Sequence, residues 1–239
     1  DIQTTGAVVL AGIINAMKIK GEELKDQAFV VYGAGSGGIG VARNICAELR
    51  NIGLDEKTAC DKVFLFDSKG LILSNRSDLT EYKRPFAKDP AILASWNMSS
   101  TEPSLLEVLE NRKATVLVGI SGQCSTFKEE HIQALLKNTD RPVVFPLTNP
   151  ADESEATPDD LYSWSNGKAI VAVGSQYPDV TFNGKQYRVG QASNAFIFPG
   201  IGMAAILSKV QILTDEMFTA AAHAMAAWVG KPDLEMGII

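Results

Sequence analysis

The sequence of 239 residues is poor in the side chains that mark several common classes of protein. It has three cysteines, at positions 46, 60 and 124, an odd number without metal-ligand spacing, which is typical of free thiols in a reducing compartment. It has no run of lysines or arginines, and its net charge is −6. We therefore expect neither nucleic acid nor an anionic membrane as the main partner.

Long apolar runs are also missing. No stretch of eighteen apolar residues occurs and no signal peptide is visible, so we expect no membrane span and a cytoplasmic location. The chain begins at Asp1 and not at a methionine, so we expect it to start inside a longer protein. Hydrophobic residues make up 46% of the sequence, which is enough for a sizeable core.

What the sequence does have is a glycine-rich stretch, FVVYGAGSGGIGVA, at residues 29–42. A short apolar run precedes the glycines, and an apolar segment compatible with a helix follows them. In this context of strand, turn and helix, the G-x-G-x-x-G pattern is typical of a dinucleotide-binding site. Gly33 would allow the sharp turn, Gly35 would let a pyrophosphate approach the backbone, and Gly38 would let the helix pack close to the strand. The alternative is a tight turn without a ligand.

The rest of the chain alternates between short apolar runs and helix-compatible segments. Apolar runs typical of buried strands occupy residues 62–67, 114–120, 141–147 and 169–173. Helices are predicted over 6–17, 126–137, 194–207 and 214–229, the helix after the glycines is expected to continue through 50–61, and Asn183 with Gly184 predicts a hairpin within 180–189. This order predicts an α/β fold, Rossmann-like and doubly wound, with a mostly parallel sheet and helices on both faces.

In such a fold, ligands bind beyond the carboxyl ends of the strands. We therefore expect the residues that follow the strands to line a single crevice: 33–38, Asp67, Ser68, Ser121, Gly122, 148–150, Gly174 and Ser175. Asp67 is suited to hydrogen-bond the adenosine ribose, although an aspartate at a strand end can also just cap its turn. Ser68, Lys69, Lys83 and Arg84 lie near it in the sequence and could hold a 2′-phosphate, so both NAD and NADP stay open.

Other polar residues admit plainer interpretations. Asn149 belongs to an Asn-Pro turn, and Asn194 opens an apolar segment that it could simply cap. His131 and His223 lie in predicted helices without an acidic or thiol partner at ligand spacing, so we interpret them as structural or surface residues. The apolar residues 195–200 are expected in the core or at an interface.

Five blocks of the sequence, taken together, resemble the malic enzyme family in the order in which that family carries them. They are DIQTT at 1–5, GAGSGGIG at 33–40, DSKGL at 67–71, PLTNP at 146–150 and NAFIFPGIG at 194–202. The resemblance implies an enzyme that oxidises L-malate with NAD or NADP and a divalent metal, Mg or Mn, and releases pyruvate and CO₂. Malolactic enzymes share these blocks, use NAD and Mn²⁺, and yield lactate.

The resemblance also implies roles for single residues. Asp1 would be a metal ligand, and a carboxylate suits Mg²⁺ or Mn²⁺. Thr5 would face the nicotinamide, Gly35 and Ser36 would hold the pyrophosphate, and Asp67 would bind the adenosine ribose. Asn149 and Asn194 would contact the malate carboxylate and the cofactor. Ser68 and Lys83 match positions where NADP-using members carry serine and lysine.

The sequence departs from the family pattern at two places and lacks part of it. Thr4, Thr5 and Gly6 stand where the family has Gly-Thr-Ala, and Ser193 precedes Asn194 in place of an asparagine. The family's acid–base tyrosine and lysine, and its Glu-Asp metal ligands, would lie upstream of Asp1, so we expect no catalytic residue in this chain.

We therefore interpret residues 1–239 as the NAD(P)-binding domain of a malic-enzyme-like protein without its amino-terminal catalytic domain. That domain is the expected partner, together with L-malate and further copies of the chain, since the family's members are usually dimers or tetramers. A standalone nucleotide-binding regulatory module is the alternative.

Overall fold

A computed structural model describes residues 2–99 and 102–239. Its main feature is a seven-stranded sheet in the order β3-β2-β1-β4-β5-β6-β9. The strands are β1 (Phe29–Tyr32), β2 (Val63–Asp67), β3 (Gly70–Leu71), β4 (Val116–Gly119), β5 (Val143–Pro146), β6 (Ile170–Val173) and β9 (Gly190–Gln191). All neighbours pair in parallel except β3, which runs antiparallel to β2 at one edge. This confirms the expected mostly parallel sheet.

Strand β1 lies inside the sheet between β2 and β4, and its residues show why these strands are apolar throughout. Phe29 and Val31 point into one hydrophobic cluster, whereas Val30, between them, points into the other. Successive side chains of a strand face opposite sides, so a strand covered on both sides needs apolar residues at every position.

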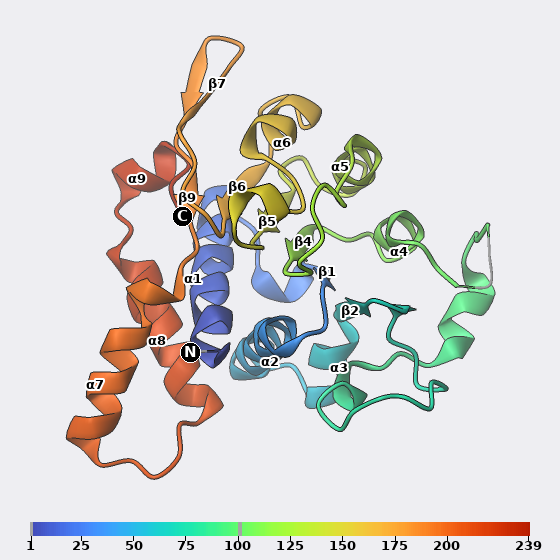
Figure 1. Cartoon of the computed structure of the whole chain (residues 1–239), viewed down its shortest axis with the longest axis horizontal. Helices are drawn as coiled ribbons and strands as arrows, with labels where there is room; N and C mark the ends of the chain where they lie inside the picture. Colours follow the sequence, from blue (N-terminus) through green and yellow to red (C-terminus); the bar gives the residue numbers. More distant parts are fainter. Residues whose placement is uncertain (1, 100–101) are drawn as a thin grey trace.

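Helices cover both faces of the sheet (Figure 1). One face packs against α1 (Ile2–Lys20) and α2 (Ser36–Asn51), with the short α3 (Glu56–Asp61) beside them, and the other against α4 (Leu105–Asn111), α5 (Glu129–Leu136) and α6 (Pro158–Trp164). The carboxyl-terminal α8 (Asp215–Trp228) packs on the outer side of α1, beyond the sheet. The doubly wound arrangement predicted from the sequence is therefore confirmed.

The structure corrects two predicted helices. The helix over 50–61 does not continue from α2: α2 ends at Asn51, and Asp55 begins α3 by accepting a hydrogen bond from the Thr58 amide at 3.0 Å. Such a side-chain cap starts a new helix. The segment 194–207 is divided into a 3-10 turn, η5 (Asn194–Phe196), and α7 (Phe198–Ser208). Pro199 lies in the first turn of α7, where a proline needs no amide donor.

The predicted hairpin and the two histidines agree with the sequence interpretation. β7 (Val180–Phe182) pairs antiparallel with β8 (Lys185–Tyr187), and both turn residues between them, Asn183 and Gly184, have positive φ, as a type I′ turn requires. His131 is buried and its Nδ1 accepts from the Lys128 amide at 3.0 Å. His223 Nε2 lies 2.8 Å from Glu48 Oε1 and connects α8 to α2.

None of the helices within residues 2–99 and 102–239 combines the length and apolarity needed to cross a lipid bilayer.

The crossing of α1 and α2 generates a prediction about stability. A Cβ added to Gly6 would lie 2.5 Å from Asn44 Nδ2 and would overlap the Gly40 carbonyl. We expect Gly6→Ala to lower the free energy of unfolding by about 1–3 kcal/mol, the usual cost of overpacking, despite the better helix propensity of alanine. Urea unfolding followed by circular dichroism measures this.

Gly200→Ala is the matched control, because Gly200 also lies in a helix but a Cβ there meets nothing within 4 Å. Its stability should stay equal or rise by up to about 1 kcal/mol. Equal stabilities of the two variants would contradict the close crossing at Gly6.

Candidate dinucleotide site at the carboxyl edge of the sheet

The turn between β1 and α2 is held by two close contacts of glycine backbone. Gly33 has φ 122°, its amide donates to the Phe66 carbonyl at 3.0 Å, and a Cβ there would overlap the Ile120 carbonyl after β4. A Cβ on Gly38 would overlap the carbonyl oxygen of Gly33. Any side chain at either position would therefore push α2 away from the sheet.

The outer side of the same turn is open. Gly35 is the N-cap of α2 and is exposed, and a Cβ built on it would meet no atom within 4 Å. Ser36, the first residue of α2, is also exposed. The first amides of a helix have no partner inside the helix, and the helix dipole adds positive charge there. The turn can therefore take an anionic group, such as a pyrophosphate, against bare backbone.

Hydrogen bonds between neighbouring strand ends join this turn to the rest of the sheet edge. The Ile120 amide donates to Tyr32 at 2.8 Å, Leu147 to Gly119 at 2.8 Å, and Gly174 to Pro146 at 3.2 Å. The Ala192 amide donates to Val173, the last residue of β6, at 2.8 Å. The segments after β2, β1, β4, β5 and β6 therefore lie in one row along the carboxyl edge, which the sequence predicts.

A buried carboxylate that the sequence interpretation missed orders the middle of this row. Glu155 is fully buried, and its Oε1 accepts from the Ser121 amide at 2.7 Å, the Ser121 hydroxyl at 2.8 Å and the Thr148 hydroxyl at 2.6 Å. The Gly122 amide in turn donates to Thr148 Oγ1 at 3.0 Å. These bonds fix the loops after β4 and β5 together, and they occupy the amide and hydroxyl protons of Ser121.

Asp67, at the end of β2, is held by two cations. Its carboxylate accepts from both terminal nitrogens of Arg76 at 2.9 Å each, from Lys83 Nζ at 2.6 Å and from the Lys69 amide at 2.9 Å. Burial opposes ionisation of this carboxyl, but the hydrogen bonds from Arg76 and Lys83 outweigh it and lower its pKa to about 2. Asp67 is therefore a carboxylate at neutral pH beside two positive charges.

Sequence order had suggested Lys69, Lys83 and Arg84 as the cations near Asp67. Lys83 does contact it, whereas the Lys69 ammonium pairs with Asp78 at 2.8 Å. Arg76 takes the place expected of Arg84. Arg76 follows the antiparallel strand β3, which brings the chain back toward Asp67. The sequence has no clear signal for this reversal.

The remaining expected residues lie on three segments. Asn149 Oδ1 accepts from the Ser175 hydroxyl at 2.5 Å, which joins the loops after β5 and β6. Asn194 begins η5, which packs against α1 and follows the Ala192 contact with β6. Thr5 lies on α1 next to the Gly6 contact with α2, and Ser68 is exposed beside Asp67. Asp1 lies outside the described residues.

The described residues alone do not fit a metal ion. Within 2–99 and 102–239, no group of three or more histidine, cysteine, aspartate or glutamate side chains could hold one. Divalent ions such as Mg²⁺ need several oxygen ligands.

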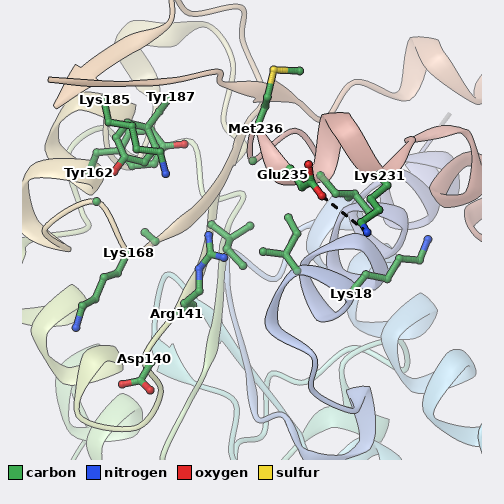
Figure 2. Close-up of a pocket in the computed structure, with 16 residues that line it drawn as sticks. Lys18, Asp140, Arg141, Tyr162, Lys168, Lys185, Tyr187, Lys231, Glu235 and Met236 are labelled. Atoms are coloured by element: carbon green, nitrogen blue, oxygen red, sulfur yellow. Dashed lines mark ion pairs between the residues drawn. The ribbon is translucent and has the colours of Figure 1, made fainter. Parts of the chain in front are cut away.

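Two sizeable cavities lie elsewhere. One of about 810 Å³ is lined by Arg141, just before β5, and by Ile170, the first residue of β6, so it lies at the opposite edge of the sheet. In it, Tyr162 and Tyr187 stack at 4.4 Å between ring centroids, with Lys185 over Tyr187 (Figure 2). Another, of about 1040 Å³, is an apolar groove of α7 and α8. The candidate dinucleotide site is therefore defined by the geometry of the strand ends and not by these cavities.

Comparison with known proteins agrees with this geometry. Residues 2–239 match the family described as "Malic enzyme, NAD binding domain". The chain is 41% identical over 234 residues to a malolactic enzyme of Lactococcus lactis, covering 97% of this chain and 43% of that protein. It is 41% identical over 226 residues to an NAD-dependent malic enzyme of Acinetobacter baylyi, covering 95% of this chain and 40% of that protein.

Solved structures give the same result. The malic enzyme from Pyrococcus horikoshii matches with a TM-score of 0.70 and 27% identity, over 96% of this chain and 47% of that one. The malic enzyme of Entamoeba histolytica matches with a TM-score of 0.66 and 28% identity, over 93% of this chain and 40% of that one. The chain thus spans less than half the length of these relatives. It belongs to the malic enzyme family and corresponds to the family's NAD-binding domain.

Proposed function

We propose that this chain is the dinucleotide-binding part of an oxidative decarboxylase that converts L-malate to pyruvate and CO₂ with NAD. The observation that carries the proposal is the open backbone of Gly35 at the start of α2. It follows β1, whose two neighbours in the sheet are β2 and β4, the point where the strand order reverses. Ligands of doubly wound sheets bind at such switch points.

We assign the residues along the edge in the order of the cofactor's parts. Gly33 and Gly38 shape the turn, and the backbone of Gly35 and Ser36 binds the pyrophosphate. Asp67 takes the adenosine ribose on the side of β2, and Ser121 and Gly122 form the wall after β4. Thr5, Asn149 and Asn194 face the nicotinamide and the malate carboxylate on the side of β6. When bound, NAD supplies the hydride acceptor, and these residues hold and orient it.

The ion cluster at Asp67 supports NAD over NADP. Arg76 and Lys83 already pair with the Asp67 carboxylate, and this negative charge opposes a 2′-phosphate. The relative from Acinetobacter baylyi and other similar proteins are named NAD-dependent malic enzymes. NADP stays the alternative, because Ser68 and the same two cations would suit a phosphate if Asp67 turned away.

The metal and malate need ligands beyond the described residues. We propose Asp1 as one ligand of Mg²⁺ or Mn²⁺, by its resemblance to the family alone, with the others coming from an amino-terminal domain. The exposed apolar side chains of α7 and the adjoining segment, Met203, Ile206, Leu207 and Ile212, support a contact with that domain or with another copy of the chain.

Two alternatives differ in measurable ways. A malolactic enzyme would have the same residues in this domain and would produce lactate, so analysis of the product of the longer protein distinguishes it. In a standalone regulatory module, NAD would bind, but malate and Mn²⁺ would never change its affinity in the longer protein.

For this proposed function, the first prediction concerns turnover. The 239-residue chain, supplied with malate, Mn²⁺ and either cofactor, should produce no NADH or NADPH above the blank in an absorbance assay. By the resemblance to the family, the acid and base that move the malate protons belong to another domain. Robust turnover would refute the assignment of the acid–base pair to another domain.

The second prediction concerns Gly35. Gly35→Ala places a methyl group where the pyrophosphate approaches, so NAD binding measured by calorimetry should weaken by about tenfold or more while the unfolding transition stays unchanged. Gly200→Ala, in α7, is the control and should bind NAD like the natural sequence. If Gly35→Ala binds NAD normally, the turn is not the pyrophosphate site.

The third prediction concerns cofactor choice. Asp67→Asn removes the charge that occupies Arg76 and Lys83, so the ratio of NADP to NAD affinity should rise by about tenfold. Lys83→Met should change this ratio in the opposite direction. Ratios that stay the same in both variants would place the adenosine ribose away from Asp67.

A further inference from the structure

Two of the three cysteines come together between α2 and α3, away from the glycine turn. Cys46 lies on α2 with Arg43 and Arg50 on the same face, at helical spacing, and Cys60 lies in the last turn of α3. The two thiols lie close enough for each to shift the pKa of the other. Cys124, the third, is exposed on a loop.

The paired thiols are reachable from solvent. Cys46 and Cys60 line the same cavity of about 390 Å³, together with Arg43, Arg50 and Tyr82. Cys46 is buried behind, and Cys60 is half-buried and therefore the more accessible sulfur. A small solute can reach Cys60 without unfolding of either helix, which distinguishes this pair from cysteines that only fill a core.

Charged groups of both signs surround the pair. The Lys88 side chain is almost completely buried, and its Nζ donates to the Cys60 carbonyl at 2.6 Å. Arg50 of α2 acts electrostatically on both thiols, and Arg43 lines the same cavity. The carboxylates nearby are Glu56, which lies 3.9 Å from Arg50, Glu81 and Asp215 on the cavity wall, and Asp61, which acts on Lys88.

These surroundings give the two sulfurs different protonation. The interaction with Cys46, aided by Lys88 and Arg50, outweighs burial and the charge of Glu56 and lowers the pKa of Cys60 to about 7. The same interaction, with burial, raises the pKa of Cys46. At pH 7, about half of Cys60 is therefore a thiolate that can attack, and Cys46 stays the thiol that can resolve.

We propose that Cys46 and Cys60 form a dithiol site that a hydroperoxide oxidises to a disulfide. The Cys60 thiolate attacks the outer peroxide oxygen; the O–O bond breaks, an S–O bond forms, and the released alkoxide or hydroxide takes up a proton. The Cys46 sulfur then attacks the Cys60 sulfenic acid: an S–S bond forms, the S–O bond breaks, and water leaves with the Cys46 proton. In total, two thiols and one hydroperoxide give a disulfide, one water and one alcohol. With hydrogen peroxide, a second water takes the place of the alcohol.

The surrounding structure allows the second step. An S–S bond is about 2.05 Å long, so the two sulfurs must approach each other to bond. The cavity leaves space beside both side chains, and α3 is a helix of only six residues joined to α2 by a short loop. We expect a shift of α3 toward α2 to bring the two sulfurs together.

The experiment treats the full chain with hydrogen peroxide at pH 7 and follows free thiols, intact mass and peptide mapping. The natural sequence should lose two thiols and two hydrogen atoms, with a Cys46–Cys60 bond that a dithiol reductant reverses, and Cys124→Ser should behave identically. In Cys46→Ser, Cys60 should stop at a sulfenic acid that dimedone traps. In Cys60→Ser, Cys46 should be oxidised at least about tenfold more slowly than Cys60 is in the natural sequence.

Cys124 gives the internal rate standard, because it is exposed and has no thiol neighbour among the described contacts. Cys60 should react about tenfold or more faster than Cys124 at pH 7. Equal rates, or over-oxidation of Cys60 without a Cys46–Cys60 bond, would overturn the proposal.

A charge variant tests the cause of the reactivity. Arg50→Gln removes a partly exposed cation, so the pKa of Cys60 should rise, its oxidation at pH 7 should slow by about threefold, and the difference should vanish at pH 9, where the thiol is ionised in both proteins. Lys137→Gln, a remote surface cation, should leave the rate unchanged. A pH-independent effect of Arg50→Gln would show that the arginine acts only through packing, and would overturn the assignment of Cys60 as the attacking thiolate.

Discussion

The close packing of the glycine turn onto the end of β4 is the constraint on which the rest of the site depends. Gly33 lies against the Ile120 carbonyl and Gly38 against the carbonyl of Gly33, so the start of α2 is fixed within contact distance of two strands. Because backbone and not side chain makes these contacts, the first amides of α2 face outward and stay available to an anion. The apolar strands behind them, buried on both sides, supply the rigid base.

Hydrogen bonds and ion pairs with neighbouring groups, and not solvent, stabilise the carboxylates along the carboxyl edge. Glu155 has hydroxyl and amide donors around its buried carboxylate, whereas Asp67 has two cations. The first arrangement orients loops. The second leaves a patch at the end of β2 whose net charge is positive, with the Asp67 carboxylate at its centre. A small rearrangement of Asp67 therefore changes what this end of the edge can bind, although the chain as a whole carries a net charge of −6.

Most of the fold could be predicted from the sequence, because buried parallel strands and the glycine turn have strong local patterns. The row of strand-end residues followed from the fold class alone. Arg76 and Glu155 could not be predicted, since each comes from an irregular segment, and only tertiary folding brings it to the edge. The break between α2 and α3 was missed because the polar residues 50–61 suit either a helix or a loop, and Asp55 decides it as a cap.

The same limit applies to the cysteines. Their number and spacing predicted free thiols, and nothing in the sequence distinguished Cys60 from Cys124, because reactivity comes from neighbours that the fold supplies. Cys46 lies about 15 Å along α2 from Ser36 by helix geometry, and Cys60 just precedes β2, which ends at Asp67. Cys46 therefore lies on the helix that begins at the glycine turn, and Cys60 lies in α3, which directly precedes the strand that ends at Asp67. A covalent bond between α2 and α3 would act on both segments at once.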